Sequence, residues 1–378
     1  MTAPSRRRRD LVAFPPSFDR PDRRRPVKLT APRAKIATGT AVAVLLLSLG
    51  FAGGAWYART SSPSPDRGAD KALAPLIPRS RIILPGILGR IDHFGYDGRR
   101  GNLFVSALGN NTVEVVNNLS VIHSIHGLGH PQAALYVGEF DRLAVSGKDG
   151  KLRFYDGKSF APLKTLDFGT DTDNMRYEAV EKRIYLGYGE GAIAMVDPAA
   201  MERLPREFAL GSHPESFQLE KKGPRIFVNL PDQESIGVID RSTGAVTRWR
   251  IEGTRTNHAL AFDEAGRRLF SAALQPGKLW VIDSDSGRVV STLRIVLGVD
   301  DLWFDTHRKR ILASGHAGAV SVIQQRDADH YDLIADVPTA VGGGTSLYLK
   351  TRTSEGLYVA VPNTSQGGSE ILFLAVQE

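Results

Sequence analysis

Polar side chains recur at one position of a pattern that repeats along the chain. In TNHALAFD, residues 256–263, His258 stands immediately before an apolar run, and six other segments align with this one. The aligned positions carry Asp92, Gln132, Asp173, Glu215, His258, Asp300 and Thr345. The residues that follow them include the polar residues His93, Asn174 and Asp301. If the fold brings the aligned positions together, we expect these residues to form one ligand-binding site.

Five of the aligned residues have side chains that bind divalent cations. These candidate metal ligands are Asp92, Asp173, Glu215, His258 and Asp300. Carboxylate oxygens favour Ca²⁺ or Mg²⁺, whereas participation of the imidazole would favour Zn²⁺ or Mn²⁺. In the alternative interpretations the same residues bind another ligand or a protein partner, or they only face water and cap loop amides.

Composition and motifs exclude several other chemistries. The chain has 378 residues and no cysteine, which excludes disulfide scaffolds, thiolate metal sites and cysteine nucleophiles. It also lacks a phosphate-binding GxxxxGK[ST] loop, an HExxH motif and a GxSxG elbow. Acidic residues at the ends of predicted strands, such as Asp263 and Asp283, precede turns, and we expect them to accept hydrogen bonds from turn amides.

The placement of the polar residues depends on the repeat, which fills residues 79–378. Each unit has an alternating run, a second run such as RLF or RIY, and a third such as KLWVID, and most units add a fourth. Period-two alternation with β-branched and aromatic residues predicts strands. Seven units of about 43 residues predict an all-β, seven-bladed β-propeller. In such a ring the first strand of each unit lines the channel, so the aligned residues would meet at one channel mouth.

The last unit has only three predicted strands, whereas an apolar run without a unit of its own precedes the first. This run is RIIL, residues 81–84. We expect it to be the outermost strand of the last blade, because pairing the two ends of the repeat closes the ring and covers an exposed strand edge.

The first 78 residues differ in composition from the rest. Residues 1–35 are rich in Arg and Pro and are predicted to be a disordered cytoplasmic tail. Residues 36–58 carry no charge and end near Trp56 and Tyr57, which predicts a transmembrane signal anchor. A cleaved signal peptide is the alternative interpretation. Residues 59–78 are predicted to be a Pro/Ser-rich linker.

Charge predicts the orientation of the anchor and argues against nucleic acid as a partner. Of the 48 basic and 41 acidic residues, residues 1–78 hold 14 and 5, which leaves 34 and 36 in the predicted propeller. The basic excess before the apolar segment predicts a cytoplasmic N-terminus and an extracytoplasmic propeller, in the periplasm or at the cell surface. The propeller itself has no basic excess, so we expect it not to bind nucleic acid.

Two stretches resemble the YVTN repeat. They are residues 102–136, with NLFVSAL and TVEVVN, and residues 268–295, with RLFSAAL and KLWVID. The chain therefore resembles YncE-like seven-bladed propeller proteins, and the resemblance implies an exported or surface-exposed protein. The preferred prediction is a membrane-anchored propeller that binds a ligand or partner at the channel mouth without catalysis. The alternative is a metal-dependent lactonase-like hydrolase or lyase, and a haem- or quinone-binding propeller is a third.

Overall fold

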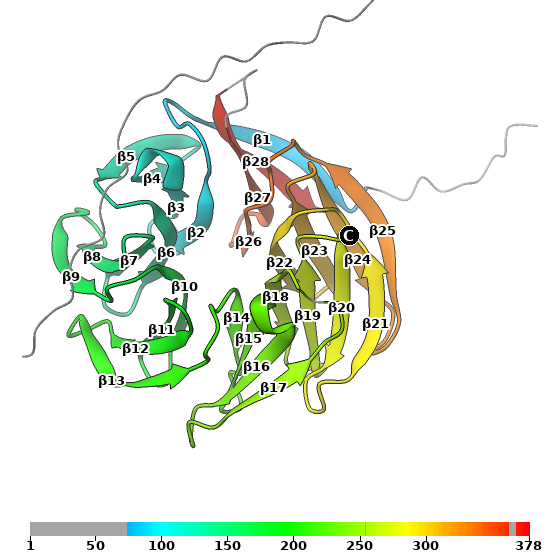
Figure 1. Ribbon diagram of the computed structural model, residues 1–378. Helices are drawn as coiled ribbons and strands as arrows, with labels where there is room; N and C mark the ends of the chain where they lie inside the picture. Colours follow the sequence, from blue (N-terminus) through cyan, green and yellow to red (C-terminus); the bar gives the residue numbers. More distant parts are fainter. Residues whose placement is uncertain (1–73, 254, 363–367) are drawn as a thin grey trace, which may run out of the picture. The chain divides into compact units, whose positions relative to one another are not determined.

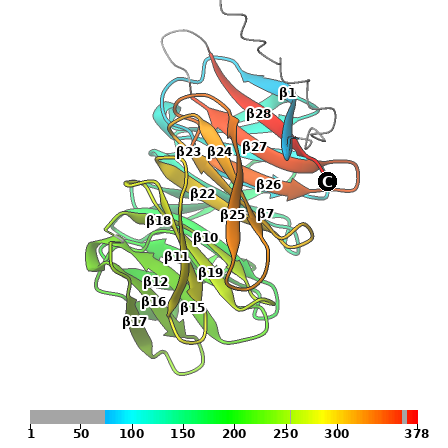
Figure 2. The ribbon, with the colours of Figure 1, turned by 90° about the vertical axis from the view of Figure 1, so that its right-hand side faces the viewer.

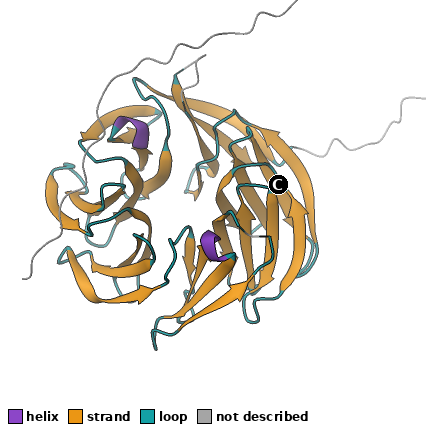
Figure 3. Ribbon diagram, in the orientation of Figure 1, coloured by secondary structure: helices purple, strands orange, loops and turns teal. Residues whose placement is uncertain are grey.

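The structure is a computed structural model, and it describes residues 74–253, 255–362 and 368–378. Within these residues the chain forms seven four-stranded sheets, arranged as the blades of a ring (Figure 1). Figure 3 shows that strands and their connecting loops make up almost all of this part of the chain. The structure confirms the prediction of an all-β, seven-bladed β-propeller.

Each of the first six blades is built from four consecutive strands. Blade I comprises β2 (Asp92–Asp97), β3 (Asn102–Ala107), β4 (Thr112–Asn117) and β5 (Ser120–His126). Blade II comprises β6 (Pro131–Val137), β7 (Arg142–Gly147), β8 (Lys151–Asp156) and β9 (Pro162–Asp167). Blade III comprises β10 (Thr172–Glu178), β11 (Arg183–Tyr188), β12 (Ala192–Asp197) and β13 (Glu202–Ala209).

The same order continues through the following blades. Blade IV comprises β14 (Phe217–Leu219), β15 (Arg225–Leu230), β16 (Ser235–Asp240) and β17 (Val246–Arg250). Blade V comprises β18 (Asn257–Asp263), β19 (Arg268–Ala273), β20 (Lys278–Asp283) and β21 (Val289–Arg294). Blade VI comprises β22 (Val299–Asp305), β23 (Arg310–Gly315), β24 (Ala319–Gln325) and β25 (Tyr331–Pro338). Two single-turn 3₁₀ helices, Leu108–Asn110 and Pro231–Gln233, follow β3 and β15 in the described part of the chain.

Blade VII joins the two ends of the repeat. It comprises β26 (Ser346–Lys350), β27 (Glu355–Val361), β28 (Ser369–Val376) and, as its outermost strand, β1 (Leu76–Leu84). β1 runs antiparallel to β28 with Leu76 opposite Val376, and Figures 1 and 2 both show the two strands side by side. The predicted closure by residues 81–84 is therefore confirmed, with a longer strand than the apolar run indicated.

The core lies between the blades. Seven clusters of buried apolar side chains fill the seven interfaces between neighbouring blades, and each cluster draws on the facing sides of two sheets. Because strand side chains alternate between faces, the period-two pattern of the sequence supplies both faces of every blade. In the interface between blades V and VI, for example, Phe270 of β19 packs with Leu302 of β22.

Arginine side chains link neighbouring blades at the turns that follow the innermost strands. Arg100 of blade I contacts Asp97 at 2.9 Å and Asp141 of blade II at 2.6 Å. Arg308 of blade VI contacts Asp305 at 3.1 Å and Glu355 of blade VII at 3.0 Å. These contacts add charge-assisted bonds to the apolar packing between the blades.

None of the helices in the part of the chain that the structure describes has the length and apolar character needed to cross a membrane. The predicted tail at residues 1–35 and the predicted anchor at residues 36–58 lie outside the described residues, as does the linker up to residue 73.

Candidate functional site at the channel mouth

β-Bulges position the aligned polar residues. The innermost strands of the blades surround the channel, and five of them lose register with their neighbour near their first residues (Figure 1). The residues skipped by these register shifts are His93, Gln132, Asp173, Asn174, His258 and Asp300. A bulge leaves its extra residue unpaired and redirects the side chain, and bulges are common beside binding sites.

Asp300 connects three blades at the mouth. Its side chain is 3% exposed and accepts a hydrogen bond of 2.6 Å from the hydroxyl of Thr345 in the lead-in to blade VII. The Nδ1 atom of His258, on blade V, lies 3.8 Å from Asp300 Oδ1, and Nε2 of His316 lies 3.9 Å from Oδ2. Burial opposes ionisation of Asp300, but the charges of His258 and His93 and the Thr345 bond outweigh it and lower the pKa of this carboxyl.

Asp92 is buried on the blade I side of the mouth. Its carboxylate lies 3.1 Å from the guanidinium of Arg90, yet burial raises the pKa of Asp92 to about 7. Arg90 in turn is influenced by four carboxylates, because the charges of Asp92, Asp300, Asp173 and Glu215 all raise its pKa. Distances show the same convergence, because His258 lies 3.0 Å from Glu215 and 3.8 Å from Asp300, and Glu215 lies within 4.8 Å of Asp173.

Asp173, His213 and Glu215 form a group of possible metal ligands. One ligand atom from each of the three lies within 4.8 Å of those of the other two. The Nδ1 atom of His213 is 2.7 Å from the carbonyl oxygen of Gly189, which orients the ring and leaves Nε2 available to a cation. Burial and the charge of Asp173 raise the pKa of Glu215, although its partner His258 acts in the opposite direction.

A second layer of polar groups lies just inside the mouth. Nδ1 of His93 is 3.4 Å from Asp301 Oδ1, and the other oxygen of Asp301 accepts the backbone N–H of Ser346 at 2.7 Å. Burial lowers the pKa of His93, but the charge and hydrogen bond of Asp301 outweigh it and raise the pKa above its usual value. These residues border a channel cavity of about 360 Å³, which Asn174, Arg176 and Trp303 also line.

The side chain of Gln132, on blade II, forms hydrogen bonds to blade III. Its amide donates to Asp171 Oδ1 at 2.7 Å, in the lead-in to blade III, and to the carbonyl of Thr172 at 2.9 Å, the first residue of that blade.

The cluster of possible metal ligands in the described residues includes Asp173 and Glu215 of the predicted set, together with His213. Asp92, Asp300 and His258 surround this cluster without belonging to it.

Sequence reasoning overlooked four residues of this region: Arg90, Arg176, His213 and His316. His213 and His316 precede or follow strands, in SHP and GHAG, and so fall outside the alignment on the strands themselves. The sequence could have indicated both histidines, because each lies in a connection at the end of its blade where the innermost strand begins. Arg176 sits inside a strand, and only the ring geometry shows that it faces the channel cavity.

The acidic residues at strand ends act as predicted. Asp97, Asp156, Asp240 and Asp283 each accept two backbone N–H groups from the turn that follows. Asp263 also accepts a turn amide, that of Gly266, at 3.0 Å. These carboxylates stabilise turns.

Comparison with known proteins identifies the fold but not a family. No protein-family model and no curated protein matches the chain. One similar solved structure is a chain in the crystal structure of the mitotic checkpoint complex, with 14% identity and a TM-score of 0.66, covering 86% of this chain and 99% of that one. Another is the crystal structure of the RRP9 WD40 repeats, with 10% identity and a TM-score of 0.67, covering 80% of this chain and 99% of that one. At these identities the likeness is one of fold, and it supports the seven-bladed propeller.

Proposed function

We propose that this protein is a binding protein whose propeller holds a ligand at the channel mouth and does not catalyse a reaction. The observation that carries the proposal is the convergence at one mouth of Asp92, Asp173, Glu215 and Asp300, which come from four different blades and are linked by contacts through Arg90, His93, His213 and His258. Partial burial of so many carboxylates is unfavourable unless positive charge compensates them. The mouth therefore suits a ligand that brings positive charge.

The ligand class that fits best is a divalent cation held by Asp173, His213 and Glu215. Two carboxylates and one imidazole form a donor set suited to Zn²⁺ or Mn²⁺, whereas Ca²⁺ and Mg²⁺ prefer oxygen alone. The contact between His213 and the Gly189 carbonyl supports this assignment, because metal-binding histidines are commonly oriented by a bond to their other nitrogen. A bound cation would also offset the repulsion between Asp173 and Glu215.

Isothermal titration calorimetry would test this assignment. The purified full-length protein would first be treated with EDTA to remove bound metal and then titrated with MnCl₂, ZnCl₂, CaCl₂ and MgCl₂. We expect one cation to bind per chain, with Mn²⁺ or Zn²⁺ bound more tightly than Mg²⁺. The double variant D173N/E215Q should weaken binding at least tenfold. The matched control is E190Q/D232N, since both of its exposed residues line the hollow beside His213. Equal affinity in both variants, or no binding by the wild type, would contradict the cation site.

The hydrolase alternative lacks a specific observation in its favour, and we do not propose it. The two similar structures are described as a multiprotein complex and a repeat domain, and neither description names a hydrolytic activity. The likeness to a protein found in a complex supports the proposal that this propeller also binds a protein partner.

We also propose that the propeller is anchored to a membrane and lies outside the cytoplasm. The uncharged segment 36–58, the basic residues before it and the YVTN-like stretches at 102–136 and 268–295 support this location. Because the chain has no native cysteine, a single introduced thiol can be labelled without background. A membrane-impermeant maleimide should label S120C in intact protoplasts and should leave S5C unlabelled until the membrane is opened. The reverse pattern would contradict the orientation.

A further inference from the structure

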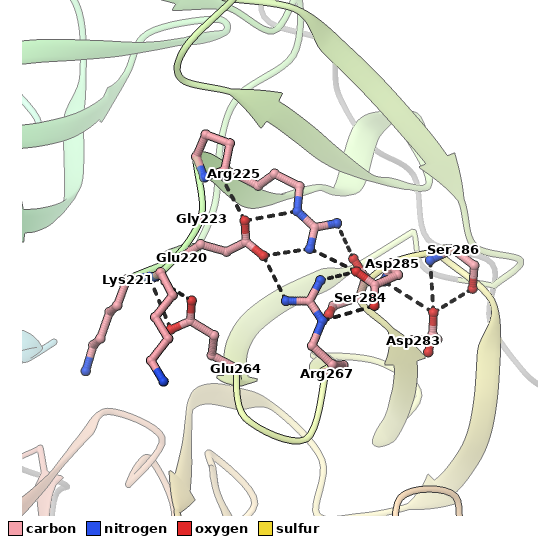
Figure 4. Close-up of polar contacts among 12 residues, drawn as sticks. Glu220, Lys221, Gly223, Arg225, Glu264, Arg267, Asp283, Ser284, Asp285 and Ser286 are labelled. Atoms are coloured by element: carbon pink, nitrogen blue, oxygen red, sulfur yellow. Dashed lines mark hydrogen bonds and ion pairs between the residues drawn. The ribbon is translucent and has the colours of Figure 1, made fainter.

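The end of the propeller opposite the channel mouth carries a charged surface with two hollows. The mouth residues lie where the innermost strands begin. The turns that follow the ends of these strands therefore lie on the opposite face of the ring. In blades IV, V and VI these turns are residues 220–224, 264–267 and 306–309. Figure 4 shows the first two of them and the network of polar contacts that joins them.

Two hollows flank the turn of blade IV. One, of about 570 Å³, is lined by residues that include Tyr185, Met195 and Arg206. The other, of about 800 Å³, is lined by residues that include Phe262 and Lys309. Both hollows share residues 221–224, so the turn forms a low ridge between them. A surface of this shape suits an extended chain that crosses the ridge better than it suits a compact small ligand.

The ridge presents two lysines without ion-pair partners. Lys221 and Lys222 are exposed, and neither makes an ion pair within the described part of the chain. Arg206 is also exposed, but its guanidinium donates to the carbonyl oxygens of Arg241 and Ser242. The backbone N–H groups of Lys221 and Lys222 donate to Glu264 at 3.2 and 2.7 Å, which fixes the turn that carries them. In Figure 4 the side chain of Lys221 points away from the neighbouring network.

Beside the ridge, the positive and negative side chains of a charged network pair with one another. Arg225 contacts Glu220 through Nε at 3.0 Å and through Nη2 at 2.6 Å, and Nη1 of Arg267 lies 3.2 Å from the same carboxylate. Asp285 contacts both arginines, so two cations face two anions (Figure 4). Lys309 lies 4.0 Å from Asp263. The unpaired positive charge is therefore concentrated at Lys221 and Lys222, with Arg206 beside them across the smaller hollow.

From this arrangement we propose that the ridge and its two hollows, the residue 221–224 surface, bind an extended acidic segment of a partner protein. Acidic side chains of the segment would pair with Lys221, Lys222 and Arg206, and its apolar side chains would lie against Met195 and Phe262 in the hollows. The propeller sequence has a slight acidic excess, so this local cationic site would direct a negatively charged segment to one place on the molecule. The site does not depend on the proposed cation cluster at the opposite mouth.

Fluorescence anisotropy would test the proposal with the full-length protein and a fluorescein-labelled ten-residue peptide of alternating Glu and Leu. We expect binding at 50 mM salt that weakens as the salt concentration rises. The variant K221E/K222E should weaken binding at least tenfold. The matched control K158E/R352E makes the same change in net charge at two exposed turn residues of blades II and VII, and it should change the affinity less than twofold. Circular dichroism melts should show that all three proteins remain folded, since these side chains face solvent.

Several results would overturn the proposal. These are absence of peptide binding, equal weakening by both double variants, or displacement of the peptide by inorganic phosphate at comparable concentration. Tighter binding of an RNA oligonucleotide than of the peptide would assign the surface to another class of partner. Measuring the same peptide with D173N/E215Q separates this site from the mouth, because we expect that variant to bind the peptide normally.

Discussion

The Nε2 atom of His258 lies 3.0 Å from Oε2 of Glu215 and so links blades V and IV across the channel mouth. Glu215 also belongs to the cluster with Asp173 and His213. One carboxylate thus stands between two histidines that have different partners. His213 is oriented by a backbone carbonyl, whereas His258 faces a second carboxylate, that of Asp300.

This arrangement predicts opposite effects for substitutions of the two histidines. H213Q removes a proposed ligand and should weaken binding of Mn²⁺ or Zn²⁺ at least tenfold. H258Q removes a group that competes for Glu215 and should leave cation binding unchanged or strengthen it a fewfold. Calorimetric titration of the two variants side by side measures both effects. If H258Q weakened binding as much as H213Q, the cation would lie nearer to His258 than we propose.

A second prediction concerns acid stability and the contact between blades I and II. Hydrogen bonds from Arg100 and Tyr136 lower the pKa of Asp141 to about 2. The folded state therefore binds fewer protons than the unfolded state, so this contribution is present above about pH 4 and is lost as the pH falls toward 2. D141N should cost about 1 kcal/mol at pH 7, after allowance for solvent screening, and about a third of that at pH 2.5.

Thermal melts of the wild type and D141N at a series of pH values would measure this difference. D232N is the control, because Asp232 is exposed and makes no ion pair within the described residues, so its substitution removes no contact of this kind. A difference between wild type and D141N that persisted unchanged at pH 2.5 would show that the contact acts through packing alone.

A third prediction tests the closure of the ring through two adjacent residues of β1. Ile82 is 3% exposed and packs in the cluster between blades VII and I, whereas Ile83 is 57% exposed. I82A should lower the free energy of unfolding by about 2–4 kcal/mol, because it leaves a cavity in that cluster. I83A should cost less than about 1 kcal/mol. Urea denaturation followed by circular dichroism distinguishes them, and similar values for both would contradict the pairing of β1 with β28.

A fourth prediction concerns the network between blades IV and V. The side chain of Glu220 is 3% exposed and receives bonds from both Arg225 and Arg267. E220Q would remove the buried one of the two carboxylates that Arg225 and Arg267 share, leaving only the exposed Asp285, and it should destabilise the protein by about 2–3 kcal/mol. E202Q is the matched control, since Glu202 is 64% exposed and, among the residues that the structure describes, pairs only with Lys164, so its loss should cost below about 0.5 kcal/mol. Equal destabilisation by the two variants would show that the Glu220 network is not specific to its buried position.

Most of the architecture could be predicted because strand alternation and turn residues are local signals. The three-strand last unit and the unmatched run at residues 81–84 even predicted how the ring closes. The site was harder to predict for a physical reason. A bulge changes which residue faces the channel, and in blade I the register shift falls at His93 instead of at Asp92, the residue aligned with His258. Alignment on strands also leaves out residues in the connections, which is how His213 escaped notice.

The pairing of β1 with β28 has a consequence for synthesis of the protein. β1 is among the first strands to leave the ribosome, but its partner is the last one made, because Leu84 pairs with Ser369 and Leu76 with Val376. Until translation is nearly complete, β1 has an unpaired edge, and Leu76, Ile82 and Leu84 lack the surroundings that later bury them. The order of synthesis therefore makes ring closure a late step of folding, and until that step the segment exposes an edge and apolar side chains at which wrong pairing or aggregation can begin.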